Sequence, residues 1–214
     1  MKLYYGSKTL LTHPQFGEGN PTNDYGLGFY LTPEKNMADL WASQYQEGGY
    51  TISYSLDLNG LSVCALSDSS ELSVLRWIAL LTKHHFSYRQ KVEYRSVMEW
   101  LDRHFSFPVD EHDVIVGYRA DDAYFNYSLG FVAGDISLET LSKAMKLGQL
   151  GVQYVLKSKK AFERIKYIES YPVPYSGDYA SLRSKTLREF HALERNEDRF
   201  RNTFIGELMK KYGE

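Results

Sequence analysis

Cysteine is almost absent from this chain of 214 residues, in which Cys64 stands alone. A single cysteine excludes an intramolecular disulfide framework and a cysteine-rich zinc site. An excess of one charge is also missing, since 25 Lys and Arg residues stand against 27 Asp and Glu residues and leave a net charge of −2. The chain therefore lacks the overall positive field that favours nucleic acid, and only a local basic patch stays open.

Long apolar runs are missing as well. The densest one, over residues 77–81, is far shorter than the ~20 residues of a membrane-spanning helix. The first residues, MKLYYGSK, turn polar at once and lack the apolar core of a signal peptide. We therefore expect a cytoplasmic protein that does not enter a membrane.

Aromatic residues, by contrast, make up 15% of the chain, and the sequence contains 18 Tyr. Tyrosine combines a large apolar ring with a polar hydroxyl. It therefore suits a site that stacks on a flat ligand and also forms hydrogen bonds.

The order of the expected elements favours an α+β fold, because strands and helices mix without strict alternation. Gly, Pro, Asn and Asp are dense over residues 7–28, which predicts a long ordered loop of the kind that is usually functional. A helix is expected to begin at Pro33, with Thr32 as its N-cap, and to end before Gly48. Strands are expected over residues 2–6, 29–32, 50–58, 113–118 and 153–157, and further helices over 72–81, 92–105, 137–147 and 161–165.

The pattern changes near the C-terminus, and we expect a domain over residues 1–174 followed by a helical extension over 175–214. Apolar residues of the extension fall at intervals of three and four or their sums, at Leu182, Phe190, Leu193, Phe200, Phe204 and Leu208. This stripe predicts one helix, or two helices separated near Asn196. The extension either packs on the domain or docks a partner chain.

Three short segments carry the functional signal. The first is Leu3-Tyr4-Tyr5-Gly6-Ser7, the second reads DYGLGFYLT over residues 24–32, and the third is Gln153-Tyr154-Val155-Leu156-Lys157. No GxGxxG motif follows an expected strand and no GxxxxGK[ST] motif is present, so the two commonest nucleotide-binding motifs are excluded.

In this order the segments resemble the ADP-ribosyltransferase superfamily. The similarity is to its diphtheria-toxin and poly-ADP-ribose-polymerase branch, whose members carry a His, a Tyr and a Glu on three separate strands. The closest likeness is to an uncharacterised, toxin-like bacterial family of that branch, and it covers most of residues 1–170. The resemblance implies a split antiparallel or mixed β-sheet core with flanking helices, NAD as co-substrate and no metal.

The resemblance also implies roles for individual residues. Gly6, with Ser7 beside it, would clamp the nicotinamide through backbone groups. Tyr30 would stack on the nicotinamide ring, with Tyr25 as a second candidate, and Gln153 would hold the ribose.

The catalytic residues implied by the resemblance are Tyr5, Tyr30 and Gln153, of which Tyr5 stands where the family has His and Gln153 where it has Glu. Arg119 follows an expected buried strand and is a candidate for the phosphates of NAD, because a guanidinium fork matches phosphate oxygens. His84 and His85 do not predict a metal site, since neighbouring helix residues point in different directions and no third ligand is evident.

The leading hypothesis is an NAD-dependent mono-ADP-ribosyltransferase of bacterial toxin type, from a toxin–antitoxin or phage-defence locus. Its acceptor would be a protein or a nucleic acid, and an antitoxin protein would be a partner. One alternative is a catalytically degenerate transferase fold that binds a nucleotide or a protein. A second alternative is a single-stranded nucleic-acid binding module that stacks bases on its tyrosines.

Overall fold

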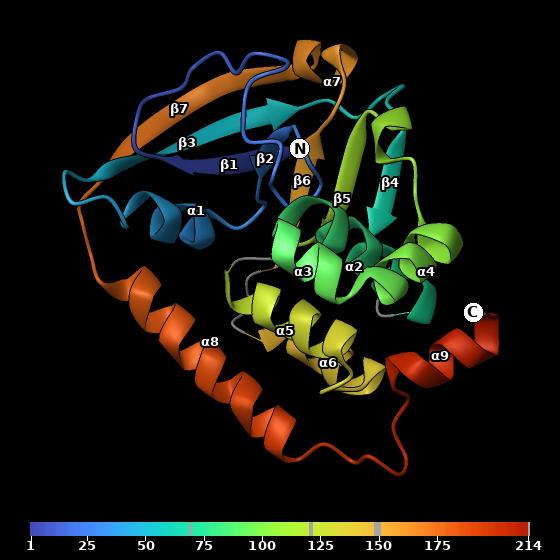
Figure 1. Cartoon of the computed structure of the whole chain (residues 1–214). Coiled ribbons are helices and arrows are strands. Elements are labelled where there is room, and N and C mark those ends of the chain that lie inside the picture. The colour runs from blue at the N-terminus through green and yellow to red at the C-terminus, as the bar shows by residue number, and fades with distance from the viewer. Residues whose placement is uncertain (69, 120–121, 148–150, 214) are drawn as a thin grey trace.

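The strands of the structure, a computed structural model, gather in two sheets, and most helices lie on one side of them (Figure 1). The structure describes residues 1–68, 70–119, 122–147 and 151–213. This is the α+β class that the sequence predicts. In the described ranges, no helix is both long enough and apolar enough to cross a membrane.

The first sheet has the strand order β1-β3-β7 and is antiparallel throughout. The second has the order β2-β6-β5-β4, in which only the β4–β5 pair is parallel. The strands are β1 (Lys2–Ser7), β2 (Phe29–Leu31), β3 (Gly49–Leu56), β4 (Val63–Leu66), β5 (Val114–Tyr118), β6 (Val152–Leu156) and β7 (Ile165–Val173).

The helices are α1 (Lys35–Ala42), α2 (Glu71–His85), α3 (Tyr88–Glu93), α4 (Arg95–Phe105), α5 (Asp122–Ala133), α6 (Leu138–Ala144), α7 (Lys159–Glu163), α8 (Asp178–Arg195) and α9 (Ile205–Tyr212), with a short 3-10 turn η1 (Val109–Glu111). Among the described helices, serine side chains cap four by accepting from the backbone N–H three residues further on: Ser70 caps α2, Ser87 caps α3, Ser137 caps α6 and Ser158 caps α7.

Within the described residues, the two sheets are joined at one residue pair, Tyr4 and Thr32. The Tyr4 N–H donates to the Thr32 carbonyl at 2.7 Å, and the Thr32 N–H donates back to the Tyr4 carbonyl at 2.9 Å. The expectation that Thr32 caps a helix beginning at Pro33 is wrong, because the N-cap of the helix that follows, α1, is Glu34. The Thr32 backbone completes this junction, and α1 begins two residues after Pro33, at Lys35.

Two hydrophobic cores lie on opposite faces of the second sheet. The smaller core fills the space between the sheets and includes Leu3, Ile52 and Leu156. The larger core joins the other face of the second sheet, through Ile115 and Val155, to the helices. Residues opposite each other on paired strands point to the same face, so Tyr30, Val155 and Ile115 share the helix-covered side.

The C-terminal extension consists of two helices separated after Arg195, with Asn196 at the end of α8, as the second reading of its stripe predicts. Phe190, Ile205 and Leu208 are buried in the larger core, and α8 runs beneath α5 and α1 in Figure 1. Phe200 does not belong to the buried stripe, because its side chain is fully exposed in the connection between the two helices.

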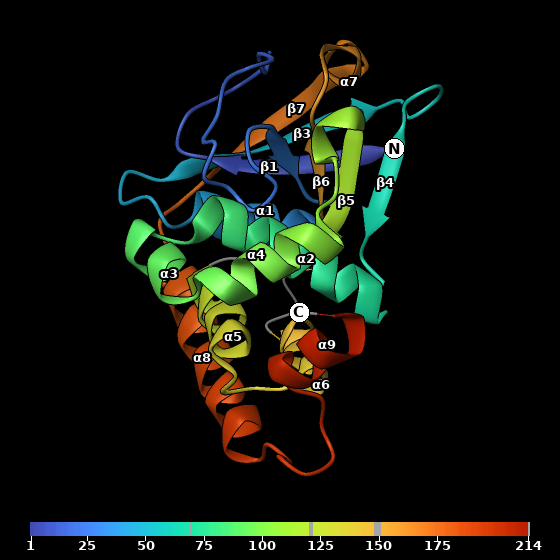
Figure 2. The same ribbon diagram turned by 45° about the vertical axis from the view of Figure 1, so that its right-hand side comes forward.

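Strands β4 and β7 are not expected from the sequence. Both are edge strands, and most of their residues keep some exposure on either face. A strand without one fully buried face shows no alternation of apolar and polar residues, so its pattern carries no strand signal. Figure 2 shows β7 running along the outer side of the first sheet beside β3.

Helix α1 packs against β1 so closely that only glycine fits at position 6. A Cβ atom on Gly6 would lie 2.2 Å from the Ala38 carbonyl oxygen and 2.7 Å from the Trp41 Cβ. Both neighbours belong to the helix scaffold and cannot rotate away. The glycine therefore sets the distance between α1 and the first sheet.

We expect Gly6→Ala to lower the free energy of unfolding by about 1–3 kcal/mol, since overpacking forces backbone shifts. Urea denaturation measures the effect. Gly206→Ala is the matched control, because no heavy atom lies within 4 Å of the Cβ it adds in α9, and a helical Ala is favoured over Gly. Equal stabilities of Gly6→Ala and the wild type would contradict the close packing of α1 on β1.

Candidate functional site

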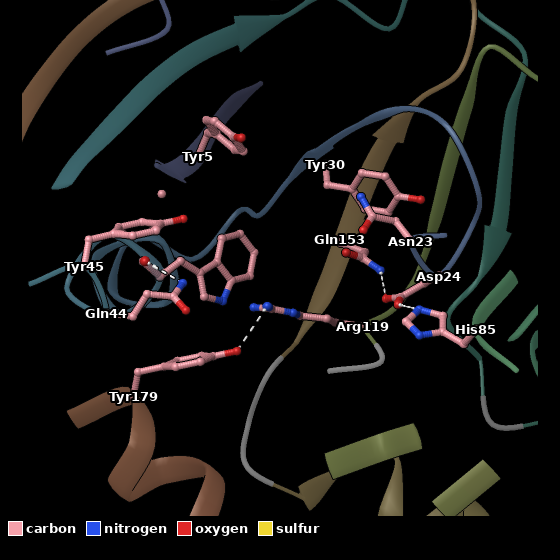
Figure 3. Close-up of a pocket in the computed structure, with 12 residues that line it drawn as sticks. Tyr5, Asn23, Asp24, Tyr30, Gln44, Tyr45, His85, Arg119, Gln153 and Tyr179 are labelled. Atoms are coloured by element: carbon pink, nitrogen blue, oxygen red, sulfur yellow. Dashed lines mark hydrogen bonds and ion pairs between the residues drawn. The ribbon is translucent and has the colours of Figure 1, made fainter. Parts of the chain in front are cut away.

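A cavity of about 380 Å³ opens where the two sheets meet (Figure 3). Five of the residues singled out in the sequence line it: Tyr5, Gly6, Tyr30, Arg119 and Gln153. They come from β1, β2, β6 and the end of β5, and so from both sheets. A volume of this size falls within the range of about 300–1,000 Å³ that is common for small-molecule sites.

The junction of the sheets explains this convergence. Tyr5 and Gly6 directly follow Tyr4, which pairs with Thr32. Tyr30 precedes Thr32 by two residues and pairs with Val155 on β6. Three segments that are far apart in the sequence are thereby held at neighbouring positions of paired strands.

Tyr30 presents its ring to the cavity while its hydroxyl is engaged by the chain. The hydroxyl donates to the Gly26 carbonyl at 2.5 Å and accepts from the Tyr25 N–H at 3.0 Å. Burial, assisted by the nearby charge of Asp24, raises the pKa of the Tyr30 hydroxyl, which stays protonated. The ring is therefore the part of Tyr30 that is available to a ligand.

Tyr5 forms another aromatic wall of the cavity. Its ring packs against the Phe29 ring with centroids 4.9 Å apart. Burial raises the pKa of the Tyr5 hydroxyl above its ordinary value, so this residue also contributes a neutral hydroxyl and an apolar face.

Gln153 belongs to a buried polar network with Asp24 and His85. The Gln153 amide Nε2 donates to Asp24 Oδ2 at 2.7 Å, and Asp24 Oδ1 lies 2.8 Å from His85 Nε2. Asp24 and Gln153 are 5% and 3% exposed, so both groups are withdrawn from bulk water. The three side chains come from the long loop, from β6 and from the last residue of α2.

This network fixes the orientation of the Gln153 amide. An ionised carboxylate only accepts hydrogen bonds, so the amide group facing Asp24 is the NH₂ group. The carbonyl oxygen, Oε1, points to the other side, toward the cavity (Figure 3). Gln153 thereby offers an acceptor to whatever occupies the cavity.

Arg119 and Trp41 form the opposite wall. The Arg119 guanidinium lies over the Trp41 ring at 4.0 Å and donates through Nη2 to the Tyr179 hydroxyl at 3.4 Å. Its Nη1 atom and the Trp41 indole Nε1 are buried and have no hydrogen-bond partner within the part of the chain that the structure describes. Buried donors are normally paired, so this wall is suited to an anionic or carbonyl-bearing ligand.

Tyr25 and Ser7 do not line the cavity. Tyr25 is fully buried, and its hydroxyl donates to the Tyr118 carbonyl at 2.8 Å. The Trp77 indole donates to the same carbonyl at 3.2 Å, so the backbone just before Arg119 is held by two donors. Tyr25 therefore positions Arg119 instead of stacking on a ligand. Ser7 is almost buried, and its hydroxyl oxygen accepts from the Thr9 N–H.

The loop over residues 7–28 is held tightly where it delivers Asp24. Lys157, with a side chain that is 3% exposed, donates to the carbonyls of Tyr25 and Leu27. Gly26 has a φ of 73°, and a Cβ there would lie 2.8 Å from the His84 ring. These contacts explain why residues 24–28, DYGLG, are needed for the fold itself, whether or not they also bind a ligand.

Several residues of the cavity were not expected from the sequence. Asp24 stands inside the second motif, but it is 129 positions from Gln153, and no sequence pattern indicates that the two side chains meet. His85 joins it at the cavity, while burial lowers the pKa of the neighbouring His84, whose ring packs on the loop. Trp41 and Tyr179 are also in the wall, and Tyr179 belongs to the C-terminal extension. Among the described residues, no group of three His, Cys, Asp or Glu side chains is placed to hold a metal ion.

A family model described as a protein of unknown function (DUF3990) matches residues 1–167. The match spans most of the chain, and the chain belongs to this family. It includes every residue named above as lining the cavity except Tyr179. No curated protein and no solved structure matches the chain significantly.

We expect Tyr30→Phe to lower the free energy of unfolding by about 1–3 kcal/mol, because it leaves the Tyr25 N–H and the Gly26 carbonyl without their partner. Urea denaturation measures this. Tyr167→Phe is the control, since Tyr167 is exposed and its hydroxyl forms a hydrogen bond of 3.1 Å with the Ser170 side chain, away from the loop. If both variants are as stable as the wild type, the Tyr30 hydroxyl does not hold the loop.

Proposed function

We propose that this DUF3990 protein is an NAD-dependent mono-ADP-ribosyltransferase. The observation that carries the proposal is that residues from all three motifs resembling that superfamily, Tyr5, Tyr30 and Gln153, line a single cavity. The two sheets that meet at Tyr4 and Thr32 support the split-sheet, ADP-ribosyltransferase-like arrangement that the resemblance implies.

The residues present fit a dinucleotide with a flat cationic ring at one end. The Tyr30 ring offers an aromatic face to nicotinamide, and the Gln153 carbonyl oxygen offers an acceptor to a ribose hydroxyl. The Arg119 guanidinium and the Trp41 indole offer donors to phosphate oxygens. Gly6 would contribute backbone groups, although its lack of a side chain is already required by α1.

In the proposed reaction the bond between ribose C1′ and the nicotinamide nitrogen breaks, its electron pair leaves with the neutral nicotinamide, and a nucleophile of the acceptor bonds to C1′ and releases its proton. The protein then has to stabilise positive charge on the ribose and exclude water. The Gln153 oxygen and the carboxylate behind it place negative charge on that side of the cavity, and the rings of Tyr5 and Tyr30 form apolar walls.

The remaining parts of the proposal come from the resemblance. The protein would be of bacterial toxin type, would act in the cytoplasm on a protein or a nucleic acid, and would be neutralised by an antitoxin protein. Growth arrest on expression of the wild type, absent for Gln153→Ala, would support this part.

A second candidate is a module that binds a nucleotide without transferring any part of it. The neutral side chains of Gln153 and Tyr5 favour it, because neither brings a charge of its own to the cavity. Charge-assisted hydrogen bonds are about twice as strong as neutral ones, so an uncharged side chain at each of these two positions stabilises a cation less than a carboxylate would.

We expect the purified protein to release nicotinamide from NAD, and Gln153→Ala to lower the turnover number about 10²–10³-fold with little change in NAD affinity. Chromatography of nicotinamide and calorimetric titration with NAD measure the two quantities. Gln90→Ala is the matched control, because the Gln90 side chain caps α3 outside the cavity. NAD binding without release would favour the second candidate, and no binding would remove both.

We expect Arg119→Ala to weaken binding of ADP-ribose about 10–100-fold, as loss of a charged hydrogen-bond donor does. Arg119→Lys should restore little of it, since an ammonium lacks the planar fork. Binding of free nicotinamide, which has no phosphate, should stay unchanged. Arg76→Ala is the control, because Arg76 lies over the Phe107 ring, away from the cavity. Equal losses for ADP-ribose and nicotinamide would contradict a phosphate contact.

A further inference from the structure

The Asp24 carboxylate contacts Gln153 and His85, which come from distant parts of the chain. Its Oδ2 accepts from Gln153 Nε2 at 2.7 Å, and its Oδ1 lies 2.8 Å from His85 Nε2. Its side chain is 7% exposed, whereas that of His85 is 25% exposed. A carboxylate at this depth is costly unless hydrogen bonds compensate the lost water, and Gln153 is one of the donors that do so.

Anchoring the loop does not by itself require Asp24. Lys157 binds the carbonyls of Tyr25 and Leu27, and the Tyr30 hydroxyl binds the Tyr25 N–H and the Gly26 carbonyl. These four contacts fix the segment that follows Asp24. Beside its contact with His85, Asp24 adds control over the Gln153 amide.

We infer that Asp24 is the positioning residue of the site: it holds the Gln153 amide so that its carbonyl oxygen faces the cavity, and the pair acts as one acceptor with a single negative charge. The role in the reaction rests on the proposed function. An amide that donates to a carboxylate is polarised, and its oxygen becomes a stronger acceptor for a ligand hydroxyl. The stabilisation grows as positive charge develops on the bound ribose, so it acts on turnover more than on binding.

The pairing also explains why an uncharged residue stands at position 153. A carboxylate there would face the Asp24 carboxylate at the present 2.7 Å contact. Two carboxylates at that distance do not both ionise at neutral pH, and one of them retains a proton. Position 153 can therefore carry an ionised carboxylate only if position 24 does not.

A reciprocal exchange tests the pairing. We expect Gln153→Glu alone to lower the melting temperature at pH 7.5. The melting temperature of this variant should return toward that of the wild type as the pH falls toward the ordinary carboxyl pKa of about 4. The sign follows from linkage: the folded pair keeps a proton that the unfolded chain releases, so stability falls as the pH rises. Asp24→Asn combined with Gln153→Glu restores one amide and one carboxylate, and its melting temperature should return close to that of the wild type at pH 7.5.

Turnover tests the positioning role. We expect Asp24→Asn to lower the turnover number for NAD about tenfold while the dissociation constant for NAD stays within about twofold. In the Gln153→Ala background the same change should have little further effect, because Asp24 acts through Gln153. Asp113→Asn is the matched control: Asp113 accepts from Ser158 and from the Ser62 N–H outside the cavity, so its loss should affect stability only.

Different outcomes would refute the Asp24–Gln153 pairing, the positioning role of Asp24 and the proposed function. If Gln153→Glu and the double variant melt alike at pH 7.5, the pairing is refuted without reference to NAD. If the exchange behaves as expected but Asp24→Asn leaves turnover unchanged, Asp24 only holds the fold and the inference is overturned. If the wild type releases no nicotinamide, the proposed function fails and the positioning role fails with it, while the melting curves still decide the pairing.

Discussion

The pairing of Tyr4 with Thr32 is the constraint on which the site depends. Two hydrogen bonds, of 2.7 and 2.9 Å, are the backbone link between a three-stranded and a four-stranded sheet. Beyond this pair the sheets diverge, and the smaller core fills one side of the gap. The cavity opens at the same place, so residues adjacent to the junction on β1 and β2 become its walls. The register of these strands thereby determines which side chains a ligand meets.

Close backbone packing sets the remaining walls. Glycine at position 6 lets α1 lie against β1, which places Trp41 at the cavity and under the Arg119 guanidinium. Gly117 has a similar function, because a Cβ there would lie 2.1 Å from the Tyr25 hydroxyl oxygen. Tyr25 can then reach the Tyr118 carbonyl and fix the chain just before Arg119. Residues whose small size or burial suggests only a structural role thus define the geometry of the functional ones.

The charges of the cavity are divided between two sides. Figure 3 shows Asp24 and His85 at one end, with Arg119 and Tyr179 displaced toward the other. At the acidic end, Asp24 accepts a hydrogen bond from the neutral Gln153 amide. At the basic end, the buried Arg119 Nη1 has no hydrogen-bond partner in the described part of the chain. Such a division suits a ligand that is cationic at one end and anionic at the other. Because α8 supplies Tyr179, the C-terminal extension contributes to this division as well as to the core.

The sequence by itself determined the fold class, most helices and the strands that have one buried face, because these depend on local periodicity and capping. It also singled out Tyr5, Tyr30, Arg119 and Gln153, which line the cavity. It misassigned Thr32 and placed Tyr25 at the ligand, since nothing in a local pattern shows that a backbone pairs across sheets or that a ring is buried. The edge strands β4 and β7 were not expected because neither has one fully buried face, so their residues do not alternate between apolar and polar. Only the tertiary structure joined Asp24 to Gln153, a contact across 129 positions of sequence. Hydrogen bonds between distant side chains leave no periodicity in the chain, so they are decided when the elements pack.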